Sequence, residues 1–136
     1  MVVDQLRGEG LKVGLLKPRV FRPFPAEEIA DALGNVKAVA VMDRSFAPGA
    51  VGAPMFQEIR SALFDYRGSA PPTINRIYGL GGRELRNADV REIFAELEAL
   101  AGGDETVPSI RMVGLRGEPL PTWTDLRPIG MPAANS

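Results

Sequence analysis

The sequence contains no cysteine and no histidine among its 136 residues. The chain therefore lacks the usual ligands of zinc and iron–sulfur clusters, the thiol nucleophile and the most common general base. No disulfide can hold the fold together. Carboxylates and lysines are the side chains left for acid–base chemistry, so we expect no metal site and no cysteine or histidine catalysis in this chain.

Long apolar runs and an excess of charge of one sign are also missing. No segment approaches the ~18 apolar residues of a membrane-spanning helix, and the first ten residues lack the basic-then-apolar order of a secretory signal. Sixteen Lys and Arg residues against seventeen Asp and Glu residues give a net charge of −1, so the surface as a whole does not attract nucleic acid or anionic lipid. We expect a cytoplasmic protein without nucleic-acid or membrane partners, in which any anion site is local.

What is present is the pattern of a single α/β domain. Apolar residues make up 45% of the chain and charged residues 24%, which is typical of a globular protein. Four apolar, β-branched runs predict strands, at residues 11–16, 36–42, 73–80 and 109–115. The second run is apolar at nearly every position after Lys37, which indicates burial on both faces and hence a parallel sheet.

Helical patterns alternate with these strands, at residues 25–34, 54–66 and 89–103, each with apolar residues one turn apart. The economical reading is an α/β fold: a three-layer wound sheet, mostly parallel, of four or so strands, with right-handed crossovers that place helices on both faces. We expect this domain to span residues 1–115. The predicted core includes five residues: Leu15, Val39, Val41, Ile77 and Phe94.

The two ends depart from this pattern. Residues 2–8 resemble the last turns of a helix that, in a wound fold, should follow a strand, and no such strand precedes them. The chain is therefore expected to lack its first strand, and the open sheet edge is expected to pair or to dimerise. Residues 116–136 are rich in proline and predict an extended tail that lies on another subunit or is disordered. Trp123 in this tail is expected to fill a groove on a neighbouring chain.

Three loops are predicted to leave strands at their carboxyl ends, at residues 17–25, 43–54 and 79–85. In a parallel wound sheet such loops share one edge, where ligands usually bind. Arginine provides local positive charge there, glycine permits close backbone approach, and helix N-termini offer free amide donors to an anion. The candidate ligand or interface residues are Arg19, Arg22, Asp43, Arg44, Gly49, Gly52, Gly81, Gly82 and Arg83.

Asp43 stands where a buried strand meets its loop. It can accept hydrogen bonds from backbone amides or pair with Arg44, and a brace for the loop is favoured over a catalytic role. The glycines at 79–82 do not complete a dinucleotide-binding or P-loop motif, so neither site is predicted. No pair of carboxylates has a spacing that indicates catalysis, and we therefore predict no catalytic residue in this chain.

Three segments together resemble one known family. "GLLKPRVFRPFPAEEIADAL", "VKAVAVMDRSFAPGAVGAPMFQEIRSAL" and "IYGLGGREL" are similar, in collinear order over about residues 2–113, to the second domain of the α chain of pyruvate:ferredoxin oxidoreductase and its 2-oxoacid relatives. That domain is similar to the C-terminal domain of transketolase, which agrees with the α/β fold inferred above.

The resemblance implies a part of an enzyme that oxidatively decarboxylates pyruvate to acetyl-coenzyme A and passes electrons to ferredoxin. Thiamine diphosphate, Mg²⁺ and iron–sulfur clusters are then expected on other domains or subunits, and none is bound by this chain. The chain is expected to be an inactive assembly domain whose partners are those domains or subunits, with a homodimer also possible. Its arginines either face protein or border the coenzyme A route, and the oxoacid is left open. The alternative is a free-standing flavodoxin-like module that binds a small phosphate-bearing ligand.

Overall fold

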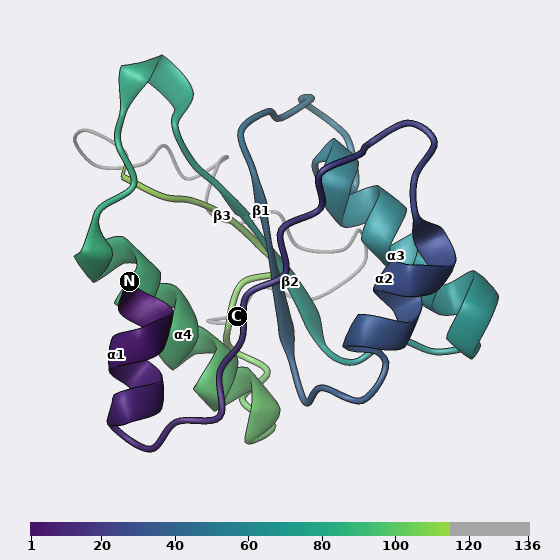
Figure 1. The fold of residues 1–136 in the computed structure, drawn as a ribbon. Helices are drawn as coiled ribbons and strands as arrows, with labels where there is room; N and C mark the ends of the chain where they lie inside the picture. Colours follow the sequence, from purple (N-terminus) through teal and green to yellow (C-terminus); the bar gives the residue numbers. More distant parts are fainter. Residues whose placement is uncertain (115–136) are drawn as a thin grey trace, which may run out of the picture.

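The computed structural model describes residues 1–114, which form four α-helices, three strands and one 3₁₀ turn within that range (Figure 1). Within these residues no helix is long and apolar enough to cross a bilayer. The predicted tail at 116–136, with Trp123, lies outside the described residues. The elements in chain order are α1 (Val2–Gly8), α2 (Ala26–Leu33), β1 (Val39–Asp43), α3 (Pro54–Arg67), β2 (Thr73–Ile77), η1 (Leu80–Gly82), α4 (Asn87–Ala101) and β3 (Ile110–Met112).

The strands form one parallel sheet in the order β1-β2-β3. Val39 is in register with Thr73, and Asn75 with Ile110. Figure 1 shows α2 and α3 on one side of the sheet and α1 and α4 on the other. The predicted α/β fold, with a parallel sheet and helices on both faces, is therefore confirmed.

The predicted strand at residues 11–16 is not formed. This segment runs as extended chain without a ladder partner, and its backbone is held locally, with Leu11 N donating to Leu6 O and Arg7 Nε donating to Val13 O. A run of apolar residues favours a strand only where a neighbouring strand pairs with it. The expected alternation of strand and helix therefore begins at β1, and α2 follows a loop instead of a strand.

The main core lies between β1 and the helices α2 and α3. Val39, Val41 and Ile77 are buried, as predicted. Leu15 was predicted to be buried but is 52% exposed, because its segment lies outside the sheet. Phe94 is half-buried on α4, so it too falls short of the predicted full burial. The buried residues of the main cluster are Ile29, Ala30, Val39, Val41, Phe56, Ile59 and Leu63.

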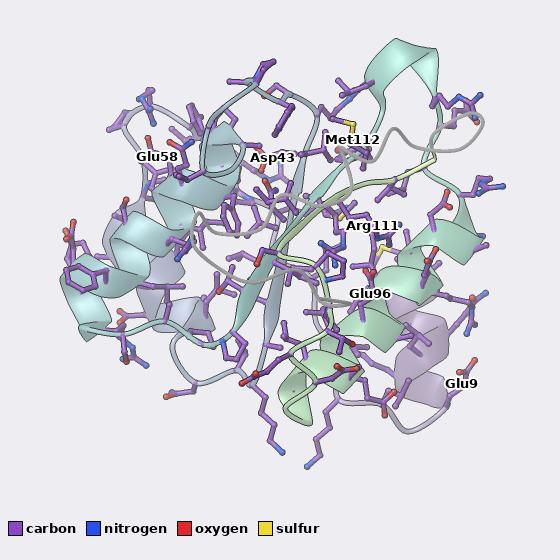
Figure 2. All side chains as sticks on the ribbon, turned by 180° about the vertical axis from the view of Figure 1, so that it is seen from behind. Glu9, Asp43, Glu58, Glu96, Arg111 and Met112 are labelled. Carbon is purple, nitrogen blue, oxygen red and sulfur yellow. The ribbon has the colours of Figure 1, made fainter. Side chains whose placement is uncertain are left out.

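The face of the sheet that is covered by α4 carries a buried ion-pair network instead of a purely apolar layer. The side chain of Arg76 on β2 is fully buried, and its Nε donates to Glu96 Oε2 of α4 at 2.8 Å. Arg111, which is in register with Arg76, donates from Nε to Glu96 Oε1 at 3.0 Å. Glu96 thus offsets two adjacent cations. Figure 2 shows Glu96 and Arg111 beside one another on this side.

Burial and charge act in opposite directions on this network. Burial lowers the pKa of the Arg76 guanidinium, and the hydrogen bond to Glu96 opposes that effect. Burial alone raises the pKa of Glu96, but hydrogen bonds and ion pairs with Arg76 and Arg111 outweigh it, so the pKa of Glu96 lies below its usual value. Removing Glu96 leaves a buried cation with no carboxylate partner.

Truncating one side chain in β2 and one in residues 11–16 should have different effects on the free energy of unfolding. Ile77→Ala should lower the free energy of unfolding by ~2 to 4 kcal/mol, because it leaves a cavity in the sheet. Leu15→Ala should change it by less than ~0.5 kcal/mol, because the side chain is already exposed. Urea denaturation followed by circular dichroism measures both; equal losses would mean that residues 11–16 pack in the core after all.

The free energy of unfolding should decrease as the pH is lowered, because Glu96 of the network becomes protonated. Glu96 has a lowered pKa in the folded state, so its contribution is complete above its unfolded pKa of ~4.3 and is lost as pH falls through the lower folded value. Glu96→Gln should cost about 3 kcal/mol at pH 7, and the gap to the unmodified chain should narrow below about pH 4.

Denaturant titrations from pH 3 to 7 measure this dependence. Arg111→Gln is the milder companion variant, because it keeps the Arg76–Glu96 pair and should retain most of the pH dependence. A gap for Glu96→Gln that stays constant across the range would contradict the assignment.

Candidate functional site

Three loops lie at the end of the molecule where the strands end. The segment at 43–54 follows β1 and the segment at 78–86 follows β2, and Tyr78 N donates to Asp43 O at 2.9 Å, which ties their starts together. Figure 1 shows the loop 43–54 between the 3₁₀ turn η1 and the loop 17–25. We call the surface of these three loops the rim. Residues 17–25 reach it without following a strand.

Asp43 holds the start of α3 from the end of β1. Its Oδ1 accepts a hydrogen bond from Met55 N at 2.9 Å, and its Oδ2 accepts from Phe56 N at 3.2 Å. The N-cap residue of α3, Ala53, has no side-chain oxygen to do this. The buried carboxylate thus serves as a helix cap supplied by the sheet; of the two expected partners of Asp43, it bonds backbone amides and, within residues 1–114, forms no ion pair with Arg44.

Asn75 completes this clamp from the neighbouring strand. Its Nδ2 donates to Asp43 Oδ2 at 2.9 Å and to Val41 O at 3.1 Å, and its Oδ1 accepts from Ala53 N at 2.9 Å. Its side chain is fully buried. The sequence analysis did not single out Asn75, although an amide in the middle of an apolar strand is a recognisable signal, since buried polar groups are almost always hydrogen-bonded.

The clamp fills the start of α3 with the chain's own side chains. Ala53, Met55 and Phe56 give their amide hydrogens to Asn75 and Asp43, and Pro54 has no amide hydrogen. The expectation that the helix N-termini of the rim offer free donors to an anion is therefore wrong for α3. A phosphate could bind there only by displacing a buried carboxylate.

The start of α4 is closed by an acid of its own first turn, Asp89, which bonds the N-cap residue. Arg86 N donates to Asp89 Oδ2 at 2.9 Å, and the Arg86 guanidinium forms an ion pair with Asp89 Oδ1 at 2.9 Å. The hydrogen bonds from Arg86 lower the pKa of the buried Asp89 carboxyl. Unlike Asp43 at α3, this carboxylate accepts hydrogen bonds from the N-cap residue and not from the amides of residues 87–89.

The predicted arginines of the rim contact different elements and do not converge on one point. Arg22 donates to Glu58 of α3 at 2.6 Å and lies over the ring of Phe21, whereas Arg19 is exposed and has no ion pair or hydrogen bond within residues 1–114. Arg44 lies 5.9 Å from the centre of the Tyr78 ring and pairs with no carboxylate of the described chain. Figure 2 shows Asp43 and Glu58 toward the same end of the molecule.

Arg83 lines a shallow pocket of about 280 Å³ between the ends of β2 and β3. Leu80 and Met112 form part of its wall, and Arg83 forms no ion pair or hydrogen bond within residues 1–114. The sequence analysis named Arg83 and Gly81 here but not the apolar walls. Met112 and Val113 come from the end of β3, about 30 residues away in the sequence, so only the tertiary structure places them beside Arg83.

Of the predicted glycines, Gly52 has the clearest requirement. Its φ of 145° and a Cβ that would collide with the Phe56 ring both exclude a side chain at the turn into α3. Gly49, Gly81 and Gly82 also have positive φ, but nothing lies within 4 Å of a Cβ built on any of them. These three glycines shape exposed turns.

The rim does not fit the thiamine diphosphate and Mg²⁺ of the resemblance. Asp43 and Asn75 are the carboxylate and amide that such a site would use, and both are buried and engaged in internal hydrogen bonds. Within residues 1–114 no group of three or more carboxylates could hold a metal ion.

Comparisons with known proteins agree on one family. Residues 1–90 match the model of "Pyruvate:ferredoxin oxidoreductase core domain II". The chain is 40% identical over 115 residues to "Pyruvate synthase subunit PorA" of Thermotoga maritima, which covers 85% of this chain and 28% of that protein. It is 45% identical over 97 residues to "Ketoisovalerate oxidoreductase subunit VorA" of Pyrococcus furiosus, which covers 71% and 24%.

A third relative is much longer. The chain is 41% identical over 104 residues to "Probable pyruvate-flavodoxin oxidoreductase" of Escherichia coli, which covers 72% of this chain and 9% of that protein. The chain thus spans between about a tenth and just over a quarter of the length of these curated relatives.

Removing the clamp should destabilise the domain. Asp43→Ala should lower the free energy of unfolding by ~2 to 4 kcal/mol, because it removes a helix cap and leaves the buried amide of Asn75 short of a partner. The matched control is Arg44→Ala, the next residue, whose exposed side chain should be worth less than ~0.5 kcal/mol. Urea denaturation measures both, and equal effects would refute the clamp.

Proposed function

This chain belongs to the pyruvate:ferredoxin oxidoreductase core domain II family, and from that premise we propose that it is the domain II part of a 2-oxoacid:ferredoxin oxidoreductase. The enzyme would decarboxylate a 2-oxoacid such as pyruvate oxidatively to its coenzyme A ester. The relatives named above are pyruvate and ketoisovalerate oxidoreductases of which this chain covers a minor part. In each relative, the matching segment is joined to further sequence that this chain does not match.

Within that enzyme, this chain is proposed to serve assembly and not catalysis. The observation that carries this role is the clamp: Asp43 at the end of β1 and Asn75 in the middle of β2 hold the start of α3. A buried side chain that holds a helix start could bind a cofactor or transfer a proton only by giving up those internal hydrogen bonds. Thiamine diphosphate, Mg²⁺ and iron–sulfur clusters therefore belong to other domains or subunits in this proposal.

The same observation weighs against the alternative of a free-standing phosphate-binding module. Such modules bind phosphate with free backbone amides at helix N-termini. Here Asp43 accepts those amides at α3, and Asp89 places a carboxylate in the first turn of α4. Two carboxylates in those positions repel an anion.

The rim supplies the surface for the partners. Arg19, Arg44 and Arg83 form no ion pairs within residues 1–114, and apolar side chains stand beside them, with Val51 76% exposed and Val20 50% exposed. Arginine beside exposed apolar residues is typical of protein interfaces. We propose that the rim faces other domains or subunits. The proposal also includes that the rim borders the coenzyme A route and that the chain forms a homodimer. It further includes that the whole enzyme is cytoplasmic and passes electrons to ferredoxin.

A domain exchange tests the assembly role. The chain replaces the matching 115 residues of the Thermotoga maritima PorA subunit, and the hybrid is purified with its partner subunits. We expect an assembled complex that oxidises pyruvate with coenzyme A and a viologen dye. This chain alone, given the same reagents with thiamine diphosphate and Mg²⁺, should show no turnover, because in this proposal the cofactors bind to other domains or subunits.

Variants of the hybrid locate the interface. Arg44→Glu combined with Arg19→Glu should reduce assembly several-fold in size-exclusion chromatography, because both reverse unpaired charges of the rim. Lys12→Glu is the matched control away from the rim and should assemble normally. Turnover by the isolated chain, or a folded hybrid that does not assemble, would overturn the proposal, and saturable calorimetric binding of coenzyme A or a nucleotide to the isolated chain would favour the alternative.

A further inference from the structure

We propose that the pocket between the ends of β2 and β3 is a binding site for a carboxylate carried on a short branched aliphatic body. Ile77, Leu80, Met112 and Val113 line it, and Arg83 supplies the only charge among its lining residues. This inference goes beyond the proposed assembly role and does not depend on it, because it rests on the pocket alone.

The charge of the pocket is unmatched. Arg83 is half-buried, yet it forms no ion pair, hydrogen bond or ring contact with any residue of the described part of the chain. Two other arginines that are buried or partly buried behave differently: Arg76 and Arg111 both donate to Glu96. A half-buried guanidinium with open donors is suited to a carboxylate, which it can bind through two parallel hydrogen bonds.

The walls define the rest of the ligand. Isoleucine, leucine, methionine and valine side chains line the pocket together with two glycine backbones. The volume of about 280 Å³ is at the lower limit of ordinary ligand pockets, which suits a group of fewer than about ten heavy atoms. Apolar walls favour an aliphatic body through its removal from water.

A phosphate fits this site less well than a carboxylate. Phosphate sites usually combine several cationic or amide donors, whereas this pocket has one guanidinium. The start of α3 cannot add donors, because its amides already donate to Asp43 and Asn75. A singly charged carboxylate matches a single arginine.

Two sources could present this chemistry: a free short-chain acid, or the carboxylate of a polypeptide next to an aliphatic side chain. The probe for the first is 3-methylbutanoate, and its uncharged control is 3-methylbutanamide. The probe for the second is N-acetyl-leucine, and its control is N-acetyl-leucinamide. Each pair has the same aliphatic body and differs in the carboxylate.

The test is an NMR titration of the full-length ¹⁵N-labelled chain. We expect saturable shifts of the Gly81, Met112 and Gly114 amides with at least one acid, and at least ten-fold weaker binding of its amide. Arg83→Gln should weaken binding at least ten-fold, and Arg44→Gln, an arginine of the rim outside the pocket, should leave it unchanged. Thermal melts of both variants check that they remain folded.

The outcomes separate the sources. Tighter binding of 3-methylbutanoate supports a free acid as ligand, and tighter binding of N-acetyl-leucine supports a polypeptide carboxylate. Equal binding of acids and amides, shifts that survive Arg83→Gln in a folded chain, or no shift up to about 50 mM of either acid would overturn the site. A Leu80→Trp variant, which fills the mouth of the pocket from a partly exposed position, should abolish binding independently of Arg83.

Discussion

The clamp of Asp43 and Asn75 is the interaction on which the arrangement of this domain depends. One buried carboxylate and one buried amide, from adjacent strands, take up the three amide hydrogens at the start of α3. Because the donors belong to the helix and the acceptors to the sheet, the same bonds fix the direction of α3 over β1. The main apolar cluster between β1, α2 and α3 then packs on an oriented helix.

The two faces of the sheet use polar groups in different ways. Asn75 and Arg76 are successive residues on β2, and successive side chains of a strand point to opposite faces of the sheet. Asn75 serves the clamp on the α3 side, and Arg76 meets Glu96 of α4 on the other side. A central strand with polar groups on both faces is costly to bury, and the internal hydrogen bonds offset that cost.

These constraints act at the edge that usually binds ligands in wound folds. The clamp and the capping of α4 leave arginine side chains, exposed apolar residues and one small pocket as the chemically available features of the rim. Such a surface suits contact with protein chains and with small carboxylates better than it suits nucleotides. The family to which the chain belongs, and the small share of its relatives that it covers, agree with a domain built to be joined to others.

Local patterns in the sequence determined the elements. Periodicity placed α2, α3 and α4 to within about two residues, and the unbroken apolar run predicted β1 in a parallel sheet, because the side-chain period and the burial of both faces are local properties. The role of Asp43 as a brace was also predictable, since a carboxylate at a strand end before a helix has few other uses. Only the tertiary structure decided that residues 11–16 have no strand to pair with, that Asn75 joins the clamp, and that Leu80, Arg83 and Met112 share a pocket. These outcomes depend on contacts between distant segments, which no local pattern records.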